Sequence, residues 1–174
     1  DMNNIICGVD EIKNQIGNLI NFNNLIGKKV SFLGDSITTY AGTMPSGYNS
    51  WYPSSSQTIK DVNNTWWKQL LNKTGMILLR NCAWSGSAVS SIRNSDVSSD
   101  TLETAYMGAS TKRINDLSTD TETPDIIIVM IGINDFRLRV PIGNWNGENE
   151  VSEGVILTFS EAYALMCQKI CKKY

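Results

Sequence analysis

Three short polar motifs stand out because each follows an apolar run and carries groups that can do chemistry. Their sequences are GDSIT at residues 34–38, NCAWSG at residues 81–86 and GIND at residues 132–135. Together they hold a serine hydroxyl, a glycine and an asparagine amide, which are groups that nucleophilic acyl transfer can use. Ligands of proteins with parallel sheets bind outside the carboxyl ends of the strands. We therefore expect the three motifs to lie close together at that end of the sheet.

Each motif taken alone is an ordinary turn, since Gly permits a bend while Asp, Asn and Ser bind nearby backbone. The three motifs in this order, each at a strand end, resemble the first three sequence blocks of the SGNH (GDSL-type) hydrolase family. The resemblance runs from about Lys28 to the end of the chain. It implies an α/β fold, a flavodoxin-like three-layer α/β/α sandwich with a parallel sheet, and the hydrolysis of acyl esters.

The resemblance also implies a role for one residue of each motif. Ser36 would be the nucleophile, while the backbone N–H of Gly86 and the side-chain amide of Asn134 would form the oxyanion hole. These roles are physically reasonable, because the oxyanion of acyl transfer needs donors that are fixed before the charge develops. A glycine lets the backbone come close to the substrate, and an asparagine amide donates at every pH. Ser36 at the start of a helix would also gain from the first-turn N–H groups.

Two carboxylates lie beside these residues, at Asp35 and Asp135. Either could be read as a catalytic acid or base. We interpret both as structural residues that bind loop backbone, which is the common role of Asp in such turns.

The chain departs from the family at the fourth block, a short Asp-x-x-His motif whose histidine activates the serine. The sequence contains no histidine, and a serine hydroxyl without an adjacent base is a poor nucleophile near neutral pH. No lysine near Ser36 replaces it, because Lys28 and Lys29 lie at the far end of the first strand. We expect first a C-terminally truncated piece of a longer enzyme, with an incomplete sheet. The alternatives are an assembly in which another chain supplies the histidine, and an inactive relative that binds ligands.

Aromatic residues near the motifs point to a substrate class. The long polar stretch at residues 38–65 holds Trp51 and Tyr52, and Trp84 lies in the second motif. Aromatic rings at a cleft suit sugar rings or flat acyl groups, so we expect an O-acylated carbohydrate, with acetyl as the acyl group. The alternative for Trp51 and Tyr52 is that they only pin the loop. A second function class is a non-catalytic carbohydrate-binding or tail-fibre-like module of the same fold.

Alternating strands and helices must position the motifs. Strands are expected over residues 30–33, 76–79 and 125–131, and helices over residues 66–71, 110–117 and 155–173. This order indicates an α/β fold with right-handed crossovers. The unbroken apolar run at 125–131 is typical of a central strand covered on both faces. The first helix is expected to start after Asn64 or Thr65, with Trp66 and Trp67 in the core.

The segment before the resemblance has its own pattern. Over residues 5–26, apolar residues recur at alternating spacings of four and three, with Asn23 as one polar member. This predicts either a short oligomerising coiled coil or an amphipathic helix packed on the domain. We therefore divide the chain into an N-terminal helical segment, 1–26, and a hydrolase domain, 27–174. A homo-oligomer would form through residues 5–26 or through completion of the sheet.

Composition excludes several function classes. The 174 residues are 41% hydrophobic and 18% charged, which indicates a globular domain. The net charge of −2 offers no electrostatic attraction to nucleic acid or to an acidic membrane surface, and no apolar run is long enough to span a membrane. No metal or cofactor is expected, and the four cysteines match neither zinc spacing nor a disulfide framework. The compartment stays open between cytoplasmic and secreted after signal removal.

Overall fold

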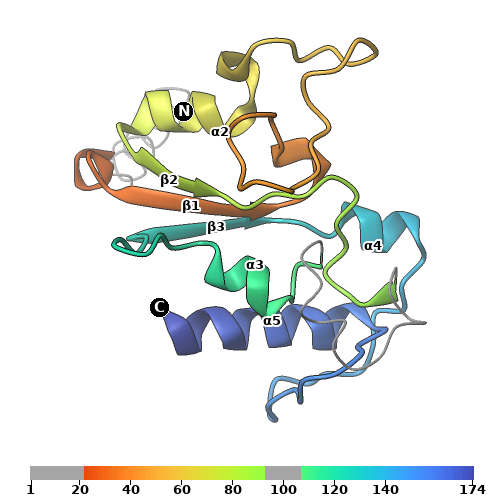
Figure 1. Cartoon of the computed structure of the whole chain (residues 1–174). Helices are drawn as coiled ribbons and strands as arrows, with labels where there is room; N and C mark the ends of the chain where they lie inside the picture. Colours follow the sequence, from red (N-terminus) through yellow and green to blue (C-terminus); the bar gives the residue numbers. More distant parts are fainter. Residues whose placement is uncertain (1–21, 93–106) are drawn as a thin grey trace, which may run out of the picture.

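A computed structural model describes residues 22–92 and 107–174 of the chain. Its centre is a sheet of three parallel strands, β1 (Lys29–Gly34), β2 (Ile77–Asn81) and β3 (Ile126–Met130), in the order β2-β1-β3 (Figure 1). This is the order in which a flavodoxin-like sheet begins. The predicted strands are confirmed, with β2 extending two residues further than expected because Arg80 and Asn81 still pair with β1.

Helices cover both faces of the sheet, so the predicted three layers are confirmed (Figure 1). On one face α2 (Trp66–Thr74) packs on Val30 and Phe32 of β1. On the other face α3 (Thr111–Asn115) and α5 (Phe159–Lys173) pack on Leu33. Successive side chains of a strand point to opposite faces, and a strand buried on both faces is therefore apolar without interruption.

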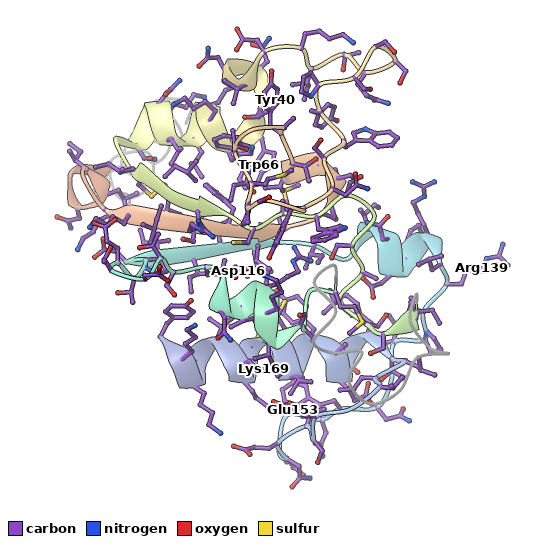
Figure 2. All side chains as sticks on the ribbon, in the orientation of Figure 1. Tyr40, Trp66, Asp116, Arg139, Glu153 and Lys169 are labelled. Carbon is purple, nitrogen blue, oxygen red and sulfur yellow. The ribbon has the colours of Figure 1, made fainter. Side chains whose placement is uncertain are left out.

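Two capping residues determine where α2 begins and ends. Thr65 accepts a 3.3 Å hydrogen bond from the N–H of Lys68 through Oγ1, which satisfies one free donor of the first turn. Gly75 ends the helix at a φ of 71°, a left-handed conformation that glycine adopts without strain. The expectation for the tryptophans is confirmed, since Trp67 is fully buried in the core cluster on the α2 side of the sheet. Trp66, which is labelled in Figure 2, packs against the same cluster.

Two expectations about the elements were wrong. The central strand is β1, whereas β3 lies at the edge of the described sheet. The apolar run of β3 indicates only that both faces of the strand are covered. Ile126 and Ile128 pack on the α2 side, and Ile127 packs on the α5 side. Such a run does not show whether the strand has a hydrogen-bonded neighbour on each edge. The last helix begins at Phe159 rather than at 155, because Thr158 is extended and Ile156 is held by a bond from its N–H to Ser91 Oγ.

Loops and short helices complete the described fold. A single 3-10 turn, η1 (Phe22–Leu25), precedes β1, and the rest of the predicted heptad segment lies outside the described residues. The long loop contains η3 (Val62–Asn64), and α4 (Ile133–Arg137) follows β3. Among the described residues, none of the helices is long and apolar enough to cross a membrane.

Candidate active site

The three polar motifs lie where the carboxyl ends of the three strands meet, as expected from the strand order. The N–H of Trp84 donates to the carbonyl of Gly34 at 3.0 Å, so the second motif runs beside the end of β1. Gly34 is also the register partner of Met130, two residues before the third motif begins. The structure therefore brings the ends of the three strands together beside Gly34, two residues before Ser36 in the sequence.

Ser36 opens a tight turn immediately after β1. The helix that was expected to begin at Ser36 is only a single 3-10 turn, η2 (Ser36–Thr38). Asp35 caps the turn, because its Oδ1 accepts the N–H of Ile37 at 3.0 Å. Gly34 is required for this geometry, since a Cβ there would lie 2.6 Å from Thr38 Oγ1. Ser36 itself is half-buried, and nothing in the described parts of the chain hydrogen-bonds to its hydroxyl.

Gly86 occupies a turn in which Ser87 donates its N–H to the carbonyl of Trp84 at 3.1 Å. Its φ is 81°, which a residue with a side chain rarely adopts. No described atom lies within 4 Å of the position that a Cβ would take. The glycine is thus explained by the backbone conformation, because the described residues leave room for a side chain at this position.

Asn134 lies in the first turn of α4 and is 6% exposed. Its Nδ2 donates to the carbonyl of Ser87 at 2.8 Å. One hydrogen of the amide is used in this bond, and a primary amide has a second hydrogen to donate. The bond joins Asn134 directly to the turn that contains Gly86.

The structural interpretation of the two carboxylates is confirmed by their bonds. Asp135 accepts the N–H groups of Val89 at 2.8 Å and of Ser90 at 3.0 Å, together with the Ser90 hydroxyl at 2.8 Å. Burial raises the pKa of Asp35 above its ordinary value, while the bond from Ile37 opposes this shift. Both carboxylates are almost fully buried and engage backbone.

Arg113 is a residue of this region that the sequence did not reveal. It projects from α3 and is fully buried, with Nη2 donating to the carbonyls of Gly34 and Cys82, each at 2.6 Å, and Nη1 donating to Ser87 Oγ. Burial lowers the pKa of Arg113 to about 10, so the guanidinium is charged at neutral pH. Its acceptors are mostly backbone oxygens, which no sequence pattern records.

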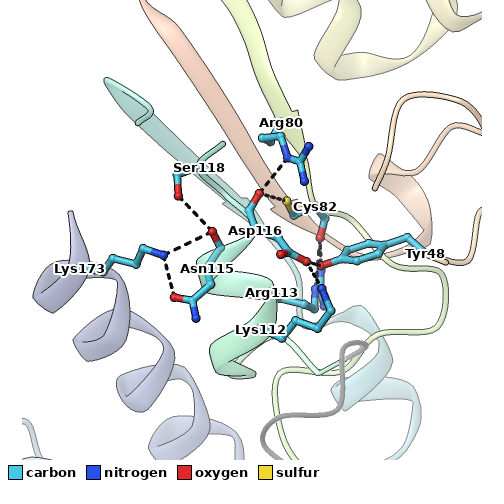
Figure 3. A network of polar contacts seen from close by, with 9 residues as sticks. All are labelled: Tyr48, Arg80, Cys82, Lys112, Arg113, Asn115, Asp116, Ser118 and Lys173. Atoms are coloured by element: carbon cyan, nitrogen blue, oxygen red, sulfur yellow. Dashed lines mark hydrogen bonds and ion pairs between the residues drawn. The ribbon is translucent and has the colours of Figure 1, made fainter. Parts of the chain in front are cut away.

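Two aromatic side chains pack against each other at the second motif. Trp84 is half-buried against Tyr48, with ring centroids 4.6 Å apart. The Tyr48 hydroxyl donates to Asp116 Oδ2 at 2.7 Å, which anchors the long loop to the end of α3 (Figure 3). Trp84 therefore rests on a ring that is itself fixed.

The other two aromatic candidates lie on the long loop. Trp51 is 46% exposed, and its N–H donates to Thr39 Oγ1 at 2.8 Å. Tyr52 is half-buried, and its carbonyl accepts the N–H of Ala41 at 2.7 Å. Their backbones hold the loop together, while the Trp51 side chain stays partly exposed.

No metal site is evident in the described ranges 22–92 and 107–174, where His, Cys, Asp and Glu form no cluster of three or more. Three cysteines of the described residues are free thiols, at Cys82, Cys167 and Cys171. Burial raises the pKa of Cys82 to about 12, which leaves this thiol protonated and unreactive at neutral pH.

The comparisons with known proteins identify the family to which this α/β sandwich belongs. The model of the family described as GDSL-like lipase/acylhydrolase matches residues 28–174. The chain belongs to this family, so it is an ester hydrolase by family. A search of curated proteins finds no match.

Two solved structures have a similar fold. A protein of Bacteroides uniformis ATCC 8492, assigned as a GDSL-like lipase, is 28% identical with a TM-score of 0.69, and the match covers 88% of this chain and 70% of that chain. A protein of Bacteroides ovatus ATCC 8483 with the same assignment is 24% identical with a TM-score of 0.67, over 85% of this chain and 68% of that chain. At this lower identity the likeness supports the fold alone.

Proposed function

We propose that Ser36 is the nucleophile of an ester hydrolase, with an oxyanion hole formed by Gly86 and Asn134. The observation that supports this most is the 2.8 Å bond from Asn134 Nδ2 to the carbonyl of Ser87. It ties the amide to the turn that presents Gly86, and the same turn is tied to Gly34 at the end of β1, two residues before Ser36. Three motifs far apart in sequence thus share one bonded framework.

The chemistry follows from these groups. Ser36 Oγ attacks the ester carbonyl carbon and loses its proton to a base, and the carbonyl oxygen becomes an oxyanion. The N–H of Gly86 and the second amide hydrogen of Asn134 stabilise that charge. The C–O bond to the alcohol then breaks, the alcohol leaves with a proton, and water hydrolyses the acyl-serine. Because these 174 residues contain no histidine, an imidazole base would come from outside them.

The proposed substrate is a small acyl ester, acetyl above all, carried on a carbohydrate. The half-buried Trp84 and the exposed Trp51 support this, since flat aromatic faces suit sugar rings. Trp84→Ala should weaken the use of acetylated sugars more than the use of p-nitrophenyl acetate. An equal loss of activity on both substrates would contradict the proposal that the substrate is a carbohydrate ester.

The reaction is tested by supplying the missing base in solution. Hydrolysis of p-nitrophenyl acetate is followed with the chain in an imidazole buffer, and the rate with Ser36→Ala is subtracted as the background. We expect a Ser36-dependent rate that rises with imidazole. Asn134→Ala should lower that rate by about a hundred- to a thousand-fold, as the loss of one oxyanion donor does in other enzymes. A rate that is equal in wild type and Ser36→Ala would contradict the proposal.

A non-catalytic carbohydrate-binding module is the second candidate, favoured by the exposed Trp51 ring. It predicts binding of unacylated sugars that survives Ser36→Ala and is lost in Trp51→Ala. Isothermal titration with both variants distinguishes this function from hydrolysis.

A further inference from the structure

We propose that Arg113 is a positioning residue that holds the Gly86 turn in register with the end of β1. This inference rests on the proposed function, because it concerns the geometry of the oxyanion hole. Arg113 does not touch the substrate in this account: it is fully buried behind the turn.

The guanidinium joins two strand ends and the turn. Nη2 donates to the carbonyl of Gly34, at the end of β1, and to the carbonyl of Cys82, in the segment that follows β2, both at 2.6 Å. Nη1 donates to Ser87 Oγ, one residue after Gly86. A planar group with donors in a fixed fork sets the relative position of all three acceptors, which a single ammonium cannot do.

Ser87 is the residue on which two bonds converge. Its hydroxyl accepts from Arg113, and its carbonyl accepts from Asn134 Nδ2. The turn that carries Gly86 is therefore held from the β1 side by Arg113 and from the β3 side by Asn134. Both proposed oxyanion donors depend on the position of this turn, so Arg113 acts on them through Ser87.

Burial strengthens the effect. Charge-assisted hydrogen bonds are stronger than neutral ones, and removing one partner leaves a desolvated group without its bond. If the turn moved away from Arg113, the hydrogen bond from the buried guanidinium to Ser87 Oγ would be lost. Placement errors of about 1 Å at a catalytic group can lower a rate by about a hundred-fold, so this restraint has a direct kinetic consequence.

The first test uses Ser87→Ala, which removes the hydroxyl that accepts from Arg113 but keeps the carbonyl that binds Asn134. We expect kcat for the Ser36-dependent, imidazole-assisted hydrolysis to fall by about ten- to a hundred-fold, with KM nearly unchanged. Ser31→Ala is the matched control, because Ser31 is equally buried and its hydroxyl donates to the carbonyl of Leu117 at 2.6 Å, away from the motifs. It should leave kcat unchanged.

The second test does not depend on catalysis. In Arg113→Lys the charge remains but the fork is lost, so the backbone amide of Gly86 should shift in the ¹H–¹⁵N spectrum and exchange faster with solvent, although Arg113 is distant from it in sequence. If Ser36→Ala and Asn134→Ala abolish the rate but Ser87→Ala behaves like Ser31→Ala, the inference on Arg113 is wrong and the proposed function stands. If Ser36→Ala changes nothing while the Gly86 amide still shifts, the hydrolase proposal fails and the restraint on the turn remains.

Discussion

At the amino end of the sheet exposed ion pairs join the strands, whereas at the carboxyl end buried hydrogen bonds join the loops that follow them. Lys28 and Asp125 form a pair at 3.3 Å and Lys29 and Glu122 one at 2.5 Å, all with side chains well exposed to solvent. At the other end the polar groups of Asn134 and its neighbours are almost fully buried, and their bonds are made within the protein.

The difference shows where the fold fixes geometry. An exposed ion pair contributes little and tolerates movement, because water and salt replace it easily. A buried polar group that loses its hydrogen-bond partner destabilises the fold. Each buried hydrogen bond at the carboxyl end of the sheet therefore restricts the movement of the residues that it joins. Restriction of this kind is what a preorganised oxyanion hole needs. The following substitutions test this contrast.

The largest effect is expected for Asp135→Ala. It leaves the buried N–H groups of Val89 and Ser90 without an acceptor, at about 1–3 kcal/mol each, so unfolding should be easier by about 3 kcal/mol or more. Glu122→Ala at the amino end should change stability by about 0.5 kcal/mol or less. Urea denaturation of both variants measures the two losses in the free energy of unfolding. Equal losses would contradict the proposed difference between the two ends of the sheet.

Asn81→Ala should have the next effect. The buried Nδ2 of Asn81 donates to the carbonyl of Thr38 at 3.0 Å and thereby ties β2 to the turn that begins at Ser36. The expected loss is about 1–3 kcal/mol. Asn63→Ala serves as the control, because the Asn63 amide bonds only to exposed Asp61 among the described residues. A control loss as large as that of Asn81→Ala would contradict the argument from burial.

A smaller effect distinguishes a satisfied buried hydroxyl from an unsatisfied one. Thr65→Ala removes the cap of α2 and should cost about 1 kcal/mol. Ser110 precedes α3 in the same position and is equally buried, but its hydroxyl has no partner in the described part of the chain. Ser110→Ala should therefore leave the thermal midpoint unchanged or raise it.

The smallest effect concerns pH. Glu161 accepts bonds from Thr158, Asn144 and Ser160, which lower its pKa to about 2 from 4.5. A lowered carboxyl pKa stabilises the fold above the unfolded value and loses that contribution as the pH falls from about 4.5 towards 2. Glu161→Gln should thus be less stable than wild type at pH 7, and the difference should vanish near pH 2. A difference in urea midpoint that grows on acidification would contradict this.

Much of the sheet could be predicted, because buried parallel strands are uninterrupted apolar runs and the polar motifs follow directly after them. The candidate site residues were indicated by three polar motifs at strand ends together with their resemblance to the sequence blocks of a known family. Arg113 could not be found in this way, since it binds backbone oxygens and a serine far away in sequence. The central place of β1 could not be predicted either, because it depends on which strands pair along their edges. The start of α5 at Phe159 depends on single hydrogen bonds of the preceding loop, which leave no periodic pattern in the sequence.

The central claim is that Ser36 becomes acylated. The chain is incubated with p-nitrophenyl acetate in imidazole buffer, digested, and examined by mass spectrometry, with Asn134→Ala as a matched variant. The account predicts an acetyl group on the peptide that contains Ser36, formed quickly in wild type and much more slowly in Asn134→Ala. Acetylation confined to surface lysines, or equal on Ser36 in both proteins, would contradict it.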